Sequence, residues 1–114
     1  MAALRVGFLG YEQVNALDIV GPAEAFASAV RDNGKGSPEP CYEVLVLGLT
    51  RRPFSAESAI IFQPATTLEN APKLDTLIIP GGCGLRVSET NATIARYIAG
   101  RAAETRRIAS VCTG

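Results

Sequence analysis

The chain has 114 residues, of which 47% are hydrophobic, and its eleven basic residues balance its eleven acidic ones. This length and apolar content predict one soluble globular body and exclude a disordered segment. No basic cluster is larger than an arginine pair, so the chain offers no electrostatic surface for nucleic acid. No apolar run reaches the roughly eighteen residues of a membrane span. We therefore expect a cytoplasmic protein without a membrane partner.

Cysteine and histidine content argues against metal and disulfide chemistry. The three cysteines are an odd number without CxxC spacing, and the chain has no histidine. The usual zinc constellations therefore cannot be assembled from these residues. The sequence implies neither a metal nor a cofactor.

Apolar runs alternate with helical patterns along the chain. A buried strand is predicted at 4–10, followed by a helix that opens at Gly21-Pro22 and ends at Asn33-Gly34. After a linker-like stretch at 34–40, strands are predicted at 42–48, 58–62 (on an edge or in a hairpin), 75–80 and 107–111, with a second helix from about Asn91. This alternation predicts a flavodoxin-like α/β fold with a doubly wound, mainly parallel sheet.

Ligands of such sheets gather at the carboxyl ends of the strands. The loop after the first strand carries Asp18, the turn after the 75–80 strand contains Gly81-Gly82, and the last strand leads to Cys112. We therefore expect these three segments at one edge of the sheet. Asp75 precedes its strand, at the opposite edge, and is predicted to be structural.

The closing residues Ser110-Val-Cys112-Thr-Gly114 have the form of a nucleophile elbow. In such a turn the flanking residues are small, the backbone is strained and the central side chain projects above the sheet. A cysteine in that place is a nucleophile or an oxidation sensor. At the end of a core strand it is otherwise a small buried hydrophobe. The elbow spacing favours the reactive interpretation.

Asp18 is either a solvated loop or cap residue or, beside the elbow, a general acid or base, with Glu24 as an alternative. The Gly81-Gly82 pair suits a tight turn and equally suits amides that point at an oxyanion. Cys83 follows this turn and could lie near the site, although a loop thiol without a task is the favoured interpretation.

Three motifs follow one another along the chain: Leu17-Asp18-Ile-Val-Gly21-Pro22-Ala-Glu24-Ala-Phe26, Leu74-Asp75-Thr-Leu-Ile-Ile-Pro80-Gly81-Gly82 and Ser110-Val-Cys112-Thr-Gly114. Their order and spacing resemble the ThiJ/PfpI family of the class I glutamine amidotransferase-like superfamily, over nearly the whole chain. Within that superfamily, the sequences of these motifs are most similar to those of the amino-terminal domain of AraC-type regulators and next to those of isonitrile hydratases. The resemblance implies that Cys112 is the nucleophile, that Asp18 interacts with it, and that amides at Gly81, Gly82 and Thr113 line an oxyanion pocket.

The resemblance also implies a domain longer than these 114 residues. Family members continue past the elbow, so we expect residues 1–114 to be the front part of a ThiJ/PfpI domain, with an incomplete sheet and an exposed apolar surface. The leading hypothesis is the ligand-sensing, dimerising portion of an AraC-type regulator that binds a small-molecule effector, forms a homodimer and reaches DNA only through a segment absent from this chain. The alternative is a cysteine-dependent enzyme, such as an isonitrile hydratase or amidase, acting on a small substrate.

Overall fold

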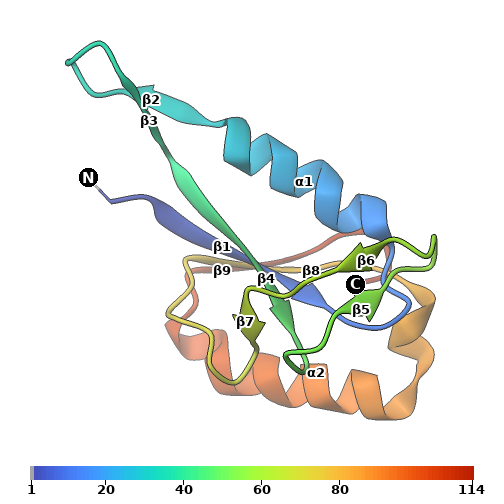
Figure 1. The fold of residues 1–114 in the computed structure, drawn as a ribbon. Helices are drawn as coiled ribbons and strands as arrows, with labels where there is room; N and C mark the ends of the chain where they lie inside the picture. Colours follow the sequence, from blue (N-terminus) through green and yellow to red (C-terminus); the bar gives the residue numbers. More distant parts are fainter. Residues whose placement is uncertain (1) are drawn as a thin grey trace.

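The apolar runs of the sequence pair as one parallel sheet of five strands. The computed structural model, which describes residues 2–114, orders them across the sheet as β7 (Thr66–Thr67), β4 (Tyr42–Gly48), β1 (Leu4–Gly10), β8 (Thr76–Ile79) and β9 (Arg107–Ser110) (Figure 1). Apart from the two-residue strand β7, their order along the chain is second, first, third and fourth, as in flavodoxin-like folds. The predicted fold class is confirmed.

Helix α1 spans Ala16–Ser28 and begins earlier than the sequence predicted. Its N-cap is Asn15, whose side-chain oxygen accepts a hydrogen bond from the Asp18 amide at 3.2 Å. The predicted start at Gly21-Pro22 is wrong, because the asparagine cap starts the helix upstream and leaves the proline inside it. The predicted end at 33–34 is also wrong, since the backbone is already extended after Ser28.

Helix α2 spans Ser88–Arg101 and links β8 to β9 on the face of the sheet opposite α1 (Figure 1). It begins before the predicted start near Asn91, because its N-cap is Val87, which provides no side-chain cap that the sequence could reveal. Short 3-10 turns flank it, η1 (Cys83–Arg86) and η2 (Ala102–Glu104). Neither of the two helices within residues 2–114 has the length and apolarity to cross a membrane.

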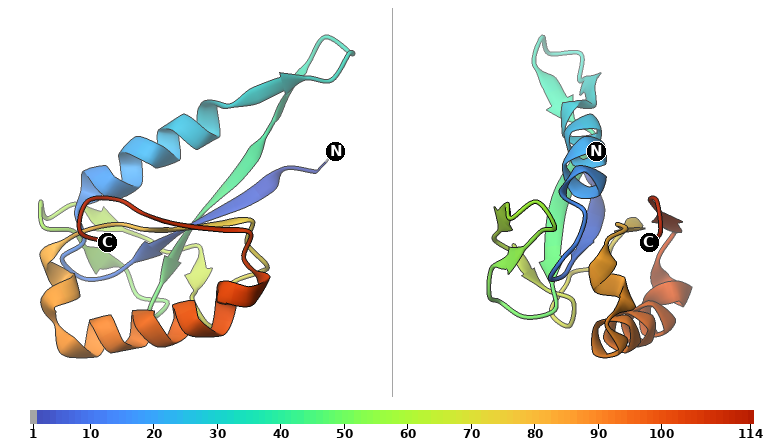
Figure 2. Two further views of the ribbon diagram at one scale, coloured as in Figure 1. Left: turned by 180° about the vertical axis from the view of Figure 1, so that it is seen from behind. Right: turned by 90° about the vertical axis from the view of Figure 1, so that its right-hand side faces the viewer.

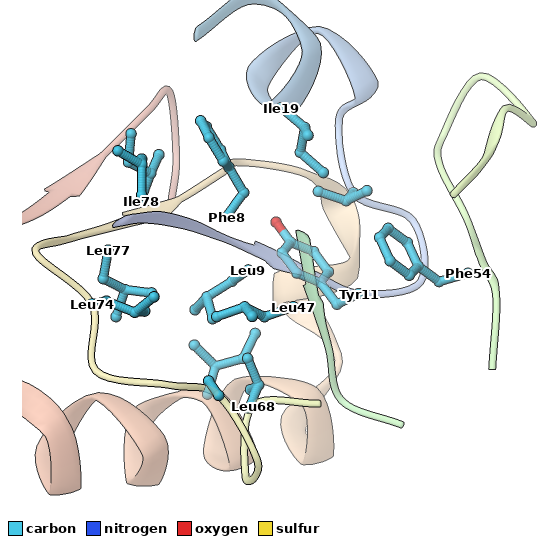
Figure 3. Close-up of a cluster of buried hydrophobic side chains, with 14 of the residues drawn as sticks. Phe8, Leu9, Tyr11, Ile19, Leu47, Phe54, Leu68, Leu74, Leu77 and Ile78 are labelled. Atoms are coloured by element: carbon cyan, nitrogen blue, oxygen red, sulfur yellow. The ribbon is translucent and has the colours of Figure 1, made fainter. Parts of the chain in front are cut away.

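The central strand β1 is covered on both faces, which explains its continuous apolar run. It pairs with β4 along its whole length and with β8 over a shorter stretch. Phe8 and Ile78 lie on the face that carries α1, whereas Leu9 and Leu77 lie on the opposite face, toward α2 (Figure 3). All four side chains are at most 4% exposed. A strand buried on both faces needs no alternation of polar and apolar residues.

Two antiparallel ribbons stand apart from the sheet. β2 (Val30–Asp32) and β3 (Pro38–Pro40) form an arm that projects away from the sheet, where the sequence predicted the end of the first helix and a linker (Figure 2). β5 (Phe54–Ser55) and β6 (Ile61–Phe62) form a hairpin, and the second of these strands falls in the 58–62 segment predicted for an edge or a hairpin. The edge strand β9 is exposed along all four of its residues.

Candidate functional site

Three loops meet where β1, β8 and β9 end. β1 has β4, the next strand of the sheet along the chain, on one side and β8 on the other, so the crevice beside it is a topological switch point, where ligands of such sheets bind. Backbone hydrogen bonds join the loops: the Asn15 amide donates to the Gly81 carbonyl at 2.8 Å, and the Val111 amide to the Ile79 carbonyl at 3.0 Å. The three segments that we expected at one edge are therefore neighbours.

Cys112 has the backbone conformation of a strained turn. Its φ angle is +57°, in the left-handed region that costs a residue other than glycine about 1–2 kcal/mol. The turn closes with a hydrogen bond from the Gly114 amide to the Val111 carbonyl at 3.0 Å. Gly114 has to be small, because a Cβ there would overlap the Ile79 carbonyl. The Cys112 side chain is left exposed, as a nucleophile elbow requires.

The Asp18 carboxylate is held at the Gly-Gly turn. One of its oxygens accepts a hydrogen bond from the Gly81 amide at 2.9 Å, while the Asp18 amide donates to the Asn15 cap. Gly81 is buried, and a Cβ there would lie 2.8 Å from both the amide nitrogen and the hydroxyl of Thr113. Asp18 thus fixes the segment that packs against the elbow, and its direct interaction with Cys112 stays a prediction.

The backbone amides at this turn differ in whether a ligand can use them. The Gly81 amide already donates to Asp18. Within the described part of the chain, the amides of Gly82 and Thr113 donate to no protein acceptor. Gly82 has a φ of +153°, and a Cβ there would lie 2.6 Å from the Gln13 carbonyl oxygen, so the turn requires glycine. Of the three predicted oxyanion donors, Gly82 and Thr113 are therefore the ones that a ligand can reach without breaking a protein hydrogen bond.

A cleft of about 670 Å³ opens beside Cys112, between the elbow, the Gly-Gly turn and the first turns of α2. That volume suits a small organic molecule. Apolar side chains form much of its wall, and polar groups stand among them; the lining includes Ile79, Leu85, Ile94, Ile98, Glu57 and Arg86. The cleft therefore combines a thiol and free amides with apolar surface.

Glu57 is a residue of this cleft that the sequence analysis missed. It lies between β5 and β6, and its carboxylate accepts hydrogen bonds from the Cys83 amide at 2.8 Å and from the Asn15 side-chain amide at 3.3 Å. These bonds, chiefly the one from the Cys83 backbone, lower the pKa of Glu57, which is therefore ionised at neutral pH. No motif contained it, because only the folding of the hairpin brings it to the site.

Cys83 is a second thiol in the same cleft. It is exposed and opens η1, directly after the Gly-Gly turn. Interaction with the nearby Glu57 carboxylate raises the pKa of the Cys83 thiol, and desolvation acts in the same direction. The sequence analysis favoured a loop thiol without a task, and the structure shows that Cys83 lines the cleft beside a carboxylate.

Tyr11 is a buried side chain that holds the strand end just before the Gly-Gly turn. Its side chain is 1% exposed, and its hydroxyl donates a hydrogen bond to the Pro80 carbonyl at 2.7 Å. Burial, followed by the charges of Asp18 and Glu57, raises the pKa of Tyr11 above its ordinary value. The hydroxyl is therefore a donor at neutral pH and fixes the residue that precedes Gly81.

The other candidates from the sequence lie away from the cleft. Asp75 accepts a hydrogen bond from the Arg5 amide at 2.8 Å, beside the amino-terminal end of β8, and its predicted structural role is confirmed. Glu24 is exposed on α1 and does not line the cleft. Within residues 2–114, no group of three or more cysteine, aspartate or glutamate side chains is placed to hold a metal ion.

The chain is similar both to an enzyme and to a regulator. Isonitrile hydratase from Pseudomonas putida is 32% identical over 112 residues, which cover 98% of this chain and 45% of the hydratase. The HTH-type transcriptional regulator GbdR from Pseudomonas aeruginosa is 27% identical over 109 residues, which cover 96% of this chain and 28% of the regulator. The chain thus spans less than half the length of these two curated relatives. No protein-family model matches it.

The fold is that of solved ThiJ/PfpI proteins. A ThiJ/PfpI family protein from Pseudomonas syringae matches with a TM-score of 0.83 at 24% sequence identity, over 100% of this chain and 44% of that protein. The expected resemblance to the ThiJ/PfpI family is therefore confirmed, together with the flavodoxin-like fold that it implies. This fold does not by itself separate the similarity to the hydratase from the similarity to the regulator.

Proposed function

We propose that this chain is the effector-binding part of an AraC-type transcriptional regulator, with a small molecule bound in the cleft beside Cys112. The observation that carries the proposal is the cleft itself, with its volume of about 670 Å³ at the switch point of the sheet. The similarity to GbdR supports a regulatory use of that cleft. In this proposal residues 1–114 are the front part of a homodimerising ThiJ/PfpI domain, and DNA contacts come from another segment.

The lining of the cleft suggests how an effector is held. A polar or anionic group of the ligand accepts hydrogen bonds from the free amides of Gly82 and Thr113. Its apolar part packs against the side chains of Leu85, Ile94 and Ile98. Asp18 contributes indirectly, because its hydrogen bond to the Gly81 amide keeps the Gly-Gly turn in place.

A second candidate function is hydration of an isonitrile. It is favoured by the 32% identity to the hydratase, which extends over 98% of this chain, and by the strained turn that exposes Cys112. In this reaction the Cys112 thiolate forms an S–C bond to the isonitrile carbon, and that carbon takes a proton from Asp18, which gives a thioimidate. Water then adds to the same carbon; one of its protons returns to the Asp18 carboxylate, the other moves to the nitrogen, and the thiolate leaves as the N-substituted formamide is released.

Binding is tested with the full-length gene product and a panel of small acids, amines and amides. An effector present at about 100 times its Kd stabilises the protein by about 2.7 kcal/mol, which a thermal-shift assay detects. Ala95→Trp fills the cleft and is expected to abolish the shift, whereas Ala92→Trp, on the same helix outside the lining, is expected to leave it unchanged. Equal shifts in both variants would place the ligand elsewhere and overturn the proposal.

Turnover separates the two candidate functions. The same protein is incubated with an aliphatic isonitrile, and the formamide is followed by chromatography. Formation of the formamide that is lost in Cys112→Ser would decide for the enzyme and refute a purely sensory role. No formamide, together with effector-dependent DNA binding, would decide for the regulator.

A further inference from the structure

We propose that Glu57 is a positioning residue that suppresses the reactivity of Cys83 and thereby leaves Cys112 as the reactive thiol of the cleft. The proposal rests on the second candidate function above, in which Cys112 is the nucleophile, and deepens it by adding a residue that no sequence motif of the site contains. Its starting point is that two exposed thiols line one cleft, and that one of them, Cys83, has a carboxylate hydrogen-bonded to its backbone amide.

The Glu57 carboxylate is bound to the backbone of Cys83, and this brings its negative charge close to the thiol. One carboxylate oxygen accepts the Cys83 amide at 2.8 Å, while the thiol itself donates toward the Gln13 oxygens at 3.9 Å. A thiolate at that place would face the negative charge of Glu57 and would lose the hydrogen bond that the thiol donates to Gln13. Since it is the thiolate that attacks alkylating and acylating reagents, these contacts lower the reactivity of Cys83.

Other groups face the Cys83 thiol and have to be weighed against Glu57. Arg86, on η1, favours the thiolate, whereas the Gln13 oxygens lie 3.9 Å from the sulfur and can accept only from a protonated thiol. Tyr11 lies within electrostatic range and is neutral at neutral pH. The balance of these groups raises the pKa of Cys83, so the carboxylate outweighs the arginine.

The same carboxylate also reaches the other side of the site. It accepts a hydrogen bond from the Asn15 side-chain nitrogen at 3.3 Å. This bond orients the Asn15 side chain so that its oxygen accepts the backbone amide of Asp18. Asp18 in turn holds the Gly81 amide. One residue of the β5–β6 hairpin therefore secures the turn that packs against the elbow and keeps the neighbouring thiol protonated. An electrophilic ligand in the cleft would then react with Cys112 and not with Cys83.

The test is the rate at which each cysteine is alkylated. Wild type and Glu57→Gln are treated with iodoacetamide at several values between about pH 6 and pH 10, quenched at intervals and analysed by peptide mass spectrometry. We expect Glu57→Gln to accelerate alkylation of Cys83 several-fold near neutral pH and to shift its pH profile toward lower pH. Cys41, which is partly buried at the start of β4, is the internal reference and keeps its rate.

A matched control separates charge from simple anchoring. The Glu12 carboxylate accepts the Ser55 amide at 2.9 and 3.0 Å, so it anchors the same hairpin and makes no hydrogen bond to Cys83. Glu12→Gln is expected to leave the Cys83 rate at the wild-type value. If Glu12→Gln accelerates Cys83 as much as Glu57→Gln does, the hairpin and not the carboxylate is responsible, and the proposal is overturned.

Two further outcomes keep the result decisive. Circular dichroism verifies that Glu57→Gln is folded, and Glu57→Ala replaces it in the assay if it is not. A folded variant in which Cys83 reacts no faster than in wild type overturns the proposal. The wild-type rates test the second candidate function separately, because Cys112 reacting no faster than Cys41 would refute a reactive Cys112 while the effect of Glu57 on Cys83 still stands.

Discussion

Removing the Asp18 carboxylate measures how firmly the Gly-Gly turn is held. In Asp18→Ala the buried Gly81 amide loses its acceptor, which costs about 1–3 kcal/mol. Asp18→Asn keeps the shape of an acceptor but makes the hydrogen bond neutral, so we expect a loss of about 1 kcal/mol. For 114 residues the entropy of unfolding is about 0.24 kcal/mol per kelvin. Each kcal/mol therefore lowers the melting temperature by about 4 °C.

Thermal unfolding followed by circular dichroism tests this expectation. Asp18→Ala is expected to melt about 4–12 °C below wild type, and Asp18→Asn about 4 °C below it. Asp75→Ala is the control, because the Asp75 carboxylate accepts the Arg5 amide at 2.8 Å in the same kind of bond, but at an exposed position. Water replaces the lost acceptor there, so the cost is less than about 1 kcal/mol. Equal losses at the two positions would refute the argument that burial of the Gly81 amide sets the cost.

Two further predictions concern the supports of the site. Gly82→Ala places a Cβ 2.6 Å from the Gln13 carbonyl oxygen at a positive φ, so it is expected to lower the free energy of unfolding in urea by about 2 kcal/mol or more. The control Gly100→Ala meets open space within α2 and is expected to raise that free energy by about 0.5–1 kcal/mol. A Gly82→Ala variant as stable as wild type would contradict the steric overlap with Gln13. Tyr11→Phe removes the donor to Pro80 and costs about 1–3 kcal/mol at neutral pH. Because the pKa of Tyr11 is raised on folding, wild type keeps the stabilisation due to that shift below pH 10.0 and loses it as the pH rises through the higher folded value. The phenylalanine variant lacks this alkaline loss, so parallel stability curves above pH 10.0 would count against the assignment.

The sheet could be predicted because each long strand is a self-contained pattern. The runs at 4–10, 42–48, 75–80 and 107–111 are rich in apolar residues and end near glycine or a small residue. A central parallel strand covered on both faces needs no more than that, and the edge strand β9, although exposed, carries the same pattern. The bounds of α1 could not be predicted as easily. Asn15 starts the helix through one side-chain hydrogen bond, and proline inside the helix looked like a better start signal than the cap.

The site was predictable where it follows the sheet and hidden where it does not. Asp18, the Gly-Gly turn and Cys112 all come after parallel strands, and the topology sends such segments to one edge. Glu57 arrives on a hairpin whose position depends on long-range bonds, such as that from the Gln13 amide to the Ser55 carbonyl at 2.8 Å. Local sequence patterns carry no trace of bonds between such distant residues, so neither Glu57 nor its effect on Cys83 could be inferred from the sequence.

The assembly of the site from loops far apart along the chain also governs when the site exists. Segments 11–18, 80–83 and 111–114 meet only after the strands between them have paired, and long loops are the slow ones to close. A chain in which only β1 and β4 have paired has no cleft, and its Cys112 is an ordinary thiol on a flexible segment. The thiol becomes part of a site at the moment β9 docks on β8, so pulse labelling during refolding would time that step from a single residue.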